Sequence, residues 1–209
     1  MCYDSSRSCQ TSLSGQGLNH AATPSLKAMS REEQERKPLK VLFKEDDFTV
    51  EDEEEARELY STGYYGEYVS GKLKLSPAEV LHLLERGRIR VYDDSGKELE
   101  FDEVAKRLMK KNPQTWLKYL VYSDLRRRGY VVKEGFSDRV EFRVYRRGAE
   151  VGSEGAKYLV YGVIEGEPLD LNNIYNMTKT ARALRKEPVL AIVNRQGEVC
   201  YYEVALVSL

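Results

Sequence analysis

The chain has few of the side chains that enzymes most often use for catalysis, since only two of its 209 residues are histidine and three are cysteine. Cys2 and Cys9 lie near the N-terminus and Cys200 lies near the other end, so they show neither a zinc-ligand spacing nor a disulfide framework. This usage is typical of a reducing, intracellular compartment. We therefore expect a cytoplasmic protein with no metal site and no cofactor.

Long apolar runs are also missing. No stretch of 18 apolar residues is present and the N-terminus has no apolar segment of the signal-peptide kind, so we expect neither a membrane partner nor secretion. With 33 basic and 34 acidic residues, the charge balance excludes a uniformly basic coat for nucleic acid but permits a local basic patch. The 32% of charged residues favours a heat-adapted source.

Three segments differ in composition. Residues 1–37 are polar and lack an apolar period, which predicts a disordered extension, and Met29 is an alternative start. Residues 38–112 predict a small N-terminal α/β domain. The Asn112-Pro113 break then opens a second domain, residues 113–209.

In the N-terminal domain the clearest signal is a helix start at Ser76-Pro77-Ala78-Glu79. Serine can cap the helix, proline suits its first position, and glutamate three residues after the serine completes a capping box. The other expected elements are strands at 39–43, 48–50 and 88–92, helices at 51–60 and 101–111, and a loop or strand at 63–69.

The second domain begins with an amphipathic helix, residues 113–128, whose apolar residues fall on one face. Strands are predicted at 130–134, 139–145, 157–165, 188–193 and 199–207, with a second helix at 171–184. The fold class is therefore α/β (α+β), with a mixed sheet flanked by helices in the second domain.

The residues alone suggest little chemistry. The chain has no glycine-rich phosphate loop and no Ser/His/Asp arrangement. His20 lies in the extension, and His82 lies in a helix between leucines, where a packing role is expected. Glu165 and Glu167 fit a solvated loop more simply than a two-metal nuclease site. The run Arg126–Arg128 fits a solvated helix end or an RNA contact.

The order of short blocks in the second domain is more informative: "LRRRGYVVKEGF", "EFRVY", "KYLVYGVIEGE" and "ARALRKEPVLAIVNRQGEVCYYEV" follow one another. These blocks resemble the nuclease domain of the archaeal and eukaryotic tRNA-splicing endonucleases over nearly all of residues 113–209. The segment "LSPAEVLHLLERGRI" is similar to the N-terminal domain of the same family.

The resemblance implies a metal-independent cleavage of RNA. In that family a tyrosine acts as base on the 2′-hydroxyl, a histidine protonates the leaving 5′-oxygen, and a lysine stabilises the charged phosphate. In-line attack requires this arrangement of a base, an acid and a fixed positive charge around phosphorus. The products are a 2′,3′-cyclic phosphate and a 5′-hydroxyl.

By this resemblance Tyr145 occupies the tyrosine position and Lys186 the lysine position, but Gly155 stands where the histidine is expected. Tyr145 at the end of an apolar strand and Lys186 at a helix end have ordinary structural explanations when taken alone. Glu154 is the nearest alternative acid, although it leaves the chain on the opposite side of a strand from its neighbour.

Other functional positions of the family also differ. The arginine that sandwiches a bulge base corresponds to Lys179, which lacks the planar cation, and its tryptophan partner corresponds to Tyr201, to within one residue. Residues 137–140, Ser-Asp-Arg-Val, replace a glycine-rich stretch.

These departures predict a structural, non-catalytic subunit of an α2β2 heterotetramer. Its partners are a catalytic paralogue and precursor tRNA with a bulge-helix-bulge motif. The apolar final segment 199–207 suits pairing with another chain. Two alternatives stay open: a catalytically active subunit that uses Glu154 as acid, and a non-enzymatic RNA-binding or assembly protein.

Overall fold

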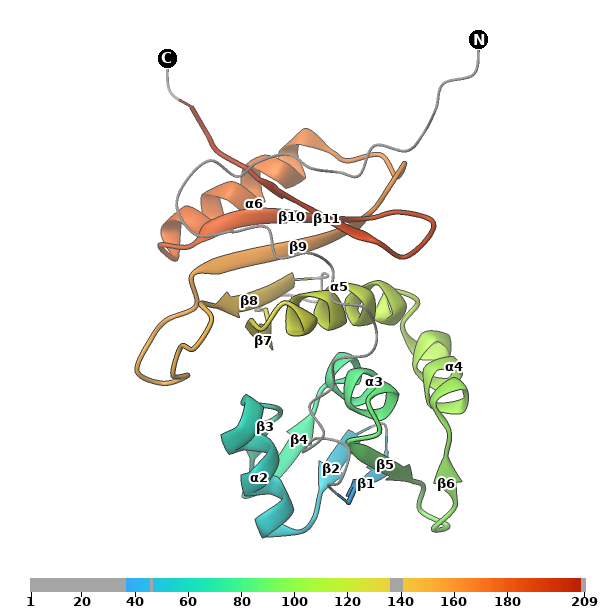
Figure 1. Ribbon diagram of the computed structural model, residues 1–209. Coiled ribbons are helices and arrows are strands. Elements are labelled where there is room, and N and C mark those ends of the chain that lie inside the picture. The colour runs from blue at the N-terminus through green and yellow to red at the C-terminus, as the bar shows by residue number, and fades with distance from the viewer. Residues whose placement is uncertain (1–36, 46, 136–140, 208–209) are drawn as a thin grey trace. The chain divides into compact units, whose positions relative to one another are not determined.

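The computed structural model describes residues 37–45, 47–135 and 141–207. Within them the chain forms two mixed β-sheets accompanied by helices, labelled in Figure 1, which confirms the predicted fold class. The predictions for the N-terminal extension, including His20 and Met29, and for Ser137–Val140 lie outside the described residues. None of the described helices is long and apolar enough to cross a membrane.

The first sheet has six strands in the order β3-β4-β2-β1-β5-β6. Only β1 and β5 are parallel, and the other neighbours are antiparallel. The strands are β1 Leu39–Lys44, β2 Asp47–Val50, β3 Glu67–Val69, β4 Lys72–Leu75, β5 Ile89–Tyr92 and β6 Glu98–Leu99. Three helices belong to this half: α2 Glu53–Gly63, α3 Pro77–Glu85 and α4 Phe101–Lys111.

The start of α3 confirms the capping box. The Ser76 hydroxyl accepts from the Glu79 backbone N–H, and the Glu79 carboxylate accepts from the Ser76 backbone N–H. The same carboxylate also accepts from Gly66 N at 3.0 Å. A cap that was predicted locally thus also fixes the loop before β3.

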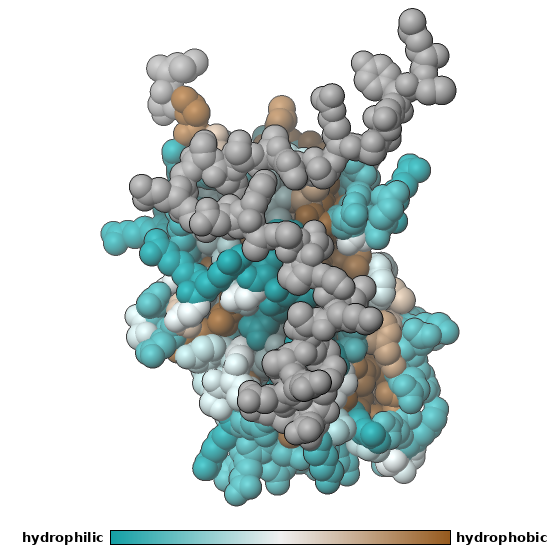
Figure 2. All heavy atoms as spheres, viewed as in Figure 1, coloured by the Kyte–Doolittle hydropathy of each residue, from teal (hydrophilic) through white to brown (hydrophobic). Residues whose placement is uncertain are grey.

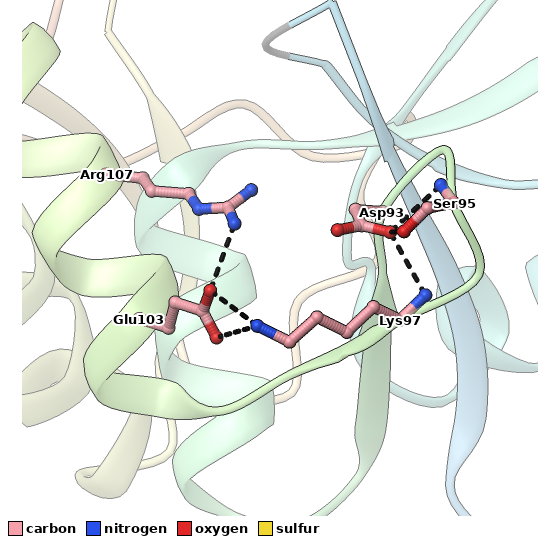
Figure 3. A network of polar contacts seen from close by, with 5 residues as sticks. All are labelled: Asp93, Ser95, Lys97, Glu103 and Arg107. Atoms are coloured by element: carbon pink, nitrogen blue, oxygen red, sulfur yellow. Dashed lines mark hydrogen bonds and ion pairs between the residues drawn. The ribbon is translucent and has the colours of Figure 1, made fainter.

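The turn between β5 and β6 is held to α4 by polar contacts (Figure 3). The Asp93 carboxylate accepts from the backbone N–H groups of Ser95 and Lys97 and from the Ser95 hydroxyl. The hydrogen bond from that hydroxyl is the first cause that lowers the pKa of Asp93. Glu103 on α4 bridges Lys97 and Arg107. All these charges are matched within the turn and α4, which indicates a structural role.

The second sheet has five strands in the order β11-β10-β9-β8-β7, and only β9 and β10 are parallel. The strands are β7 Val131–Glu134, β8 Glu141–Tyr145, β9 Tyr158–Ile164, β10 Glu187–Val193 and β11 Val199–Glu203. Helices α5, Thr115–Arg127, and α6, Leu171–Ala183, lie on opposite sides of this sheet (Figure 1).

The alternation of side chains along the strands assigns the two faces. Val144 and Val160 belong to the large apolar cluster that contains the buried residues of α5. Leu159 and Tyr161 instead pack with Met177 of α6. Successive strand residues point to opposite faces of the sheet. Helix α5 therefore covers one face, with Val144 and Val160, and α6 covers the other, with Leu159 and Tyr161.

The structure differs from the predicted strands at three places. β4, whose four residues KLKL alternate, was missed, and β6 has only two residues, too few to show an alternating pattern. The last strand ends at Glu203, four residues before the predicted end. Beyond Val204, whose N–H donates to Pro188 O at 3.1 Å, the apolar residues find no ladder partner in the described chain. The expected domain break at Pro113 falls between α4 and α5 and stays a prediction.

Helix α5 and strand β7 also contact the first half of the chain. The Arg126 guanidinium of α5 lies 4.1 Å from the centre of the Tyr65 ring, and Lys133 of β7 donates to Gly66 O.

A histidine lies between α3 and α5. On α3, His82 is buried and its Nδ1 is 3.0 Å from the Ser123 hydroxyl of α5. Burial first, and then the charge of Arg126, lowers the pKa of His82 to about 3, so this imidazole is neutral at pH 7.

Candidate functional site

Tyr145 is the last residue of β8 and is only 7% exposed. It does not share the α5 face of the sheet with its neighbour Val144. It packs in a small cluster with Ala149 and Ala156, which lie in the loop from β8 to β9. Tyr145 therefore contacts the segment in which the histidine position was predicted.

Lys186 reaches the same segment from the opposite direction. Arg185 adopts a left-handed conformation (φ 54°) directly after α6, and the Lys186 N–H donates to Ala181 O at 2.8 Å. This turn directs the half-buried Lys186 side chain inward, and its Nζ donates to Ala156 O at 2.9 Å. A non-glycine residue at positive φ is uncommon and is often found near functional sites.

Gly155 precedes Ala156 and is exposed. A Cβ placed on Gly155 would meet no heavy atom within 4 Å, and the residue does not have a positive φ. The backbone therefore accommodates a side chain at this position, although the chain supplies none. Tyr145, Gly155 and Lys186, which the sequence placed at the base, acid and lysine positions, are thus gathered around Ala156.

Glu154 is exposed on the other side of Gly155. Its backbone N–H donates to Glu150 O at 3.0 Å, and its Cα pairs with Val151 in an isolated bridge, so it belongs to a tight turn. Of the described histidines, only His82 is available as an alternative acid, and it is buried against α5. No three His, Cys, Asp or Glu side chains of the described residues are grouped so that they could hold a metal ion.

The structure does not bring Lys179 and Tyr201 together. Lys179 is exposed on α6. The Tyr201 hydroxyl donates to Asp124 of α5 at 2.8 Å, on the opposite face of the sheet. Burial, followed by the charge of Asp124, raises the pKa of Tyr201 well above its usual range, so the hydroxyl stays protonated. The next residue, Tyr202, is 40% exposed and pairs with Leu190, which packs on the α6 side.

Sequence reasoning missed that Arg126, at the end of α5, is half-buried among aromatic rings. The run Arg126–Arg128 was predicted to be solvated or to contact RNA, but the Arg126 guanidinium also lies 6.0 Å from the Tyr122 ring and donates to Tyr130 O at 3.4 Å. Its aromatic neighbour Tyr65 is remote in the sequence, so no local pattern could have indicated this contact. Arg127 and Arg128 remain exposed.

Comparison with known proteins assigns the two halves. Residues 115–201 match the tRNA intron endonuclease catalytic C-terminal domain, and residues 39–105 match the N-terminal domain of the same enzymes. These matches cover the strands, α5 and the positions around Ala156.

Whole-chain relatives agree with the domain matches. A tRNA-splicing endonuclease of Thermococcus onnurineus is 40% identical over 173 residues, which are 83% of this chain and 99% of the relative. That of Thermococcus kodakarensis is 42% identical over 72% of this chain and 87% of its own length. That of Methanococcoides burtonii is 40% identical over 70% of this chain but only 41% of its own, longer sequence. The chain therefore belongs to the tRNA intron endonuclease family.

Proposed function

We propose that this chain is the structural subunit of a tRNA-splicing endonuclease whose cutting sites lie on a catalytic paralogue. The observation that carries the proposal is the arrangement around Ala156. Tyr145 and Lys186 both contact that residue, while Gly155 leaves open space where an acid is required. The scaffold of a three-residue site is retained, and one of its three groups is missing.

The missing group matters because the reaction is a concerted in-line displacement. The 2′-oxygen attacks phosphorus as it loses its proton, and the 5′-oxygen leaves as it gains one. A positioned general acid contributes about 10²–10⁴ in rate. Residues of one site act as a unit, so Tyr145 and Lys186 without the acid do not retain a proportional share of the activity.

Tyr145 and Lys186 also make structural contacts within this chain. The Tyr145 ring is almost fully covered, and the Lys186 ammonium group donates to a backbone carbonyl. Both observations support a packing role in this chain. Lys179 supports it further, because lysine cannot stack on a base as the planar guanidinium does.

Assembly with the paralogue would use the β11 edge of the second sheet. β11 pairs only with β10 among the described strands, and an edge strand is a common place for pairing with another chain. The residues that follow are apolar, Val207 being 78% exposed, and Figure 2 shows hydrophobic surface at this C-terminal end. Two such chains and two catalytic subunits would place two cutting sites at the spacing of two splice sites.

The proposal is tested with purified protein and an intron-containing precursor tRNA. We expect the chain alone to leave the precursor intact and a mixture with a histidine-containing paralogue to cut at both splice sites. Efficient cutting by the chain alone would contradict the proposal and would favour Glu154 as acid. A chain that neither cuts nor joins the paralogue would instead indicate a separate RNA-binding or assembly role.

A further inference from the structure

A row of cations held by tyrosine rings lies on the α5 face of the second sheet. Its Tyr158 adjoins the end of the sheet that carries Tyr145, whereas Tyr201 pairs with Ala191 nearer the middle of the sheet. We call it the cation–tyrosine strip: Arg128, Arg147 and Lys157, with Tyr130, Tyr158 and Tyr201. Of these residues, the sequence singles out only Arg128, in a run that fits an RNA contact, and Tyr201, as the partner of a bulge-base sandwich. The other four residues are explained neither by the sequence motifs nor by the site around Ala156.

The strip consists of two groups of contacts, which adjoin where Arg128 and Tyr130 follow the end of α5. The Arg147 guanidinium lies 5.1 Å from the centre of the Tyr130 ring, and that ring meets Tyr158 edge to face at 6.4 Å. Lys157 Nζ lies 4.7 Å from the centre of the Tyr158 ring. Arg128 lies 5.2 Å from the ring of Tyr201, which is anchored by its hydrogen bond to Asp124.

The tyrosines fix the cations while leaving both arginines accessible. The Lys157 side chain is 28% exposed, and its Nζ also lies 3.4 Å from the Glu187 carboxylate. The three rings are partly buried and pack on the apolar cluster under α5. The Arg128 side chain is 49% exposed and Arg147 is exposed as well. Arg128 uses its Nε–H for Asp124 at 2.6 Å, and an arginine has five donor hydrogens, so others stay available. Among the described residues, Arg147 has no ion-pair partner.

The strip meets the site around Ala156 at Lys157. The Lys157 N–H donates to Val144 O at 2.9 Å, next to Tyr145, and the preceding carbonyl accepts from Lys186. The C-terminal end of α5, the end of β8 and the start of β9 all lie at this end of the sheet, from which the loop 146–157 projects at the left of Figure 1. A chain of phosphates could thus follow the rim of the sheet from one face to the other.

We infer that the cation–tyrosine strip binds the sugar-phosphate backbone of precursor tRNA on the α5 side. Two of its three cations are arginines, whose forked donors match phosphate oxygens. Cations held along a rim suit a repeating backbone, and no base edge has to be read. The inference rests on the proposed function, since it takes RNA as the partner, and it explains how a chain without a complete site would still hold the substrate.

The test uses the chain assembled with its paralogue and a precursor tRNA whose splice-site 2′-hydroxyls are replaced by hydrogen, so that binding is measured without cleavage. The strip variant is Arg128→Gln, Arg147→Gln and Lys157→Gln together. The matched control is Arg57→Gln, Arg90→Gln and Lys97→Gln, three cations that are 70%, 54% and 60% exposed in the first half of the chain. Thermal unfolding of both variants checks that they remain folded.

Each lost phosphate contact lowers the slope of log K against log salt by about 0.7–0.9. We therefore expect the slope of the strip variant to fall by about two to three, with an affinity loss of at least about tenfold at 0.1 M salt, while the control is unchanged. If the complex with the strip variant binds RNA with an unchanged slope, the inference that the strip binds RNA is overturned and the proposed function is left intact. A different outcome is that the strip variant fails to assemble with the paralogue while the free chain keeps an unchanged slope for RNA binding. That result would assign the strip to contact with an acidic protein surface and would also overturn the inference. An unsubstituted complex that does not bind precursor tRNA overturns both proposals.

Discussion

Two glycines of this chain differ in what a side chain would meet. Gly155 lies in open space without a positive φ. Gly66 has φ +73°, and a Cβ there would come within 2.7 Å of Lys74 O. Gly66 also donates to Glu79 and accepts from Lys133. The glycine at 66 is thus required by the fold, whereas the glycine at 155 is not.

We predict that Gly155→Ala changes the free energy of unfolding by no more than about 0.5 kcal/mol, as for an ordinary surface substitution. Gly66→Ala should cost at least about 1–2 kcal/mol, because it combines a left-handed backbone with a clash against a backbone oxygen. Denaturant unfolding of both variants measures the difference. A destabilisation of Gly155→Ala comparable to that of Gly66→Ala would mean that position 155 is not open.

His82 predicts a pH dependence of stability. Its pKa is about 3 in the folded chain and 6.5 in the unfolded chain, so the unfolded state binds the proton first as the pH falls. The contribution of the neutral imidazole is present above pH 6.5 and is lost progressively between pH 6.5 and 3. From pH 7.5 to 5 this loss amounts to about 2 kcal/mol.

His82→Asn keeps an acceptor near the Ser123 hydroxyl but does not titrate in this range. We expect its unfolding free energy to fall less steeply between pH 7.5 and 5 than that of the unsubstituted chain. Urea unfolding at a series of pH values compares the two. Parallel curves would show that His82 already binds its proton in the folded state.

At the level of single elements, features set by neighbouring residues could be predicted from the sequence, whereas features set by distant residues could not. The start of α3 was predictable because serine, proline and glutamate act within four residues. β11 was predicted too long because apolar content alone does not supply a neighbouring strand. The meeting of Tyr145, Gly155 and Lys186 followed from the order of the blocks. The hydrogen bond from Lys186 to Ala156 O and the packing of Arg126 on the Tyr65 ring depend on residues distant in sequence and could not be predicted.

Removing the cap of α3 tests its contribution. Ser76→Ala removes the hydroxyl that accepts from the Glu79 N–H, and we expect a loss of about 0.5–2 kcal/mol in unfolding free energy. Ser61→Ala is a matched control, since that hydroxyl only donates to Glu58 O on the exposed side of α2. An equal effect of the two substitutions in thermal unfolding would indicate that the cap does not stabilise α3.

At the level of the whole molecule, the proposal divides labour between two chains of one fold. This chain would supply scaffold, partner surface and RNA contacts, and its paralogue would supply the complete site. We expect light scattering to show at most a dimer for the chain alone and a tetramer after addition of the paralogue. A stable monomer under both conditions would contradict this assembly.

The most direct test of the central claim is single-turnover cleavage of precursor tRNA by the assembled enzyme, with substitutions placed in one kind of subunit at a time. If the working sites lie on the paralogue, Tyr145→Phe and Lys186→Ala in this chain will leave the rate nearly unchanged, and the equivalent changes in the paralogue will abolish cutting. A rate that falls about a hundredfold with Tyr145→Phe in this chain, as expected when a positioned general base is lost, would contradict the account.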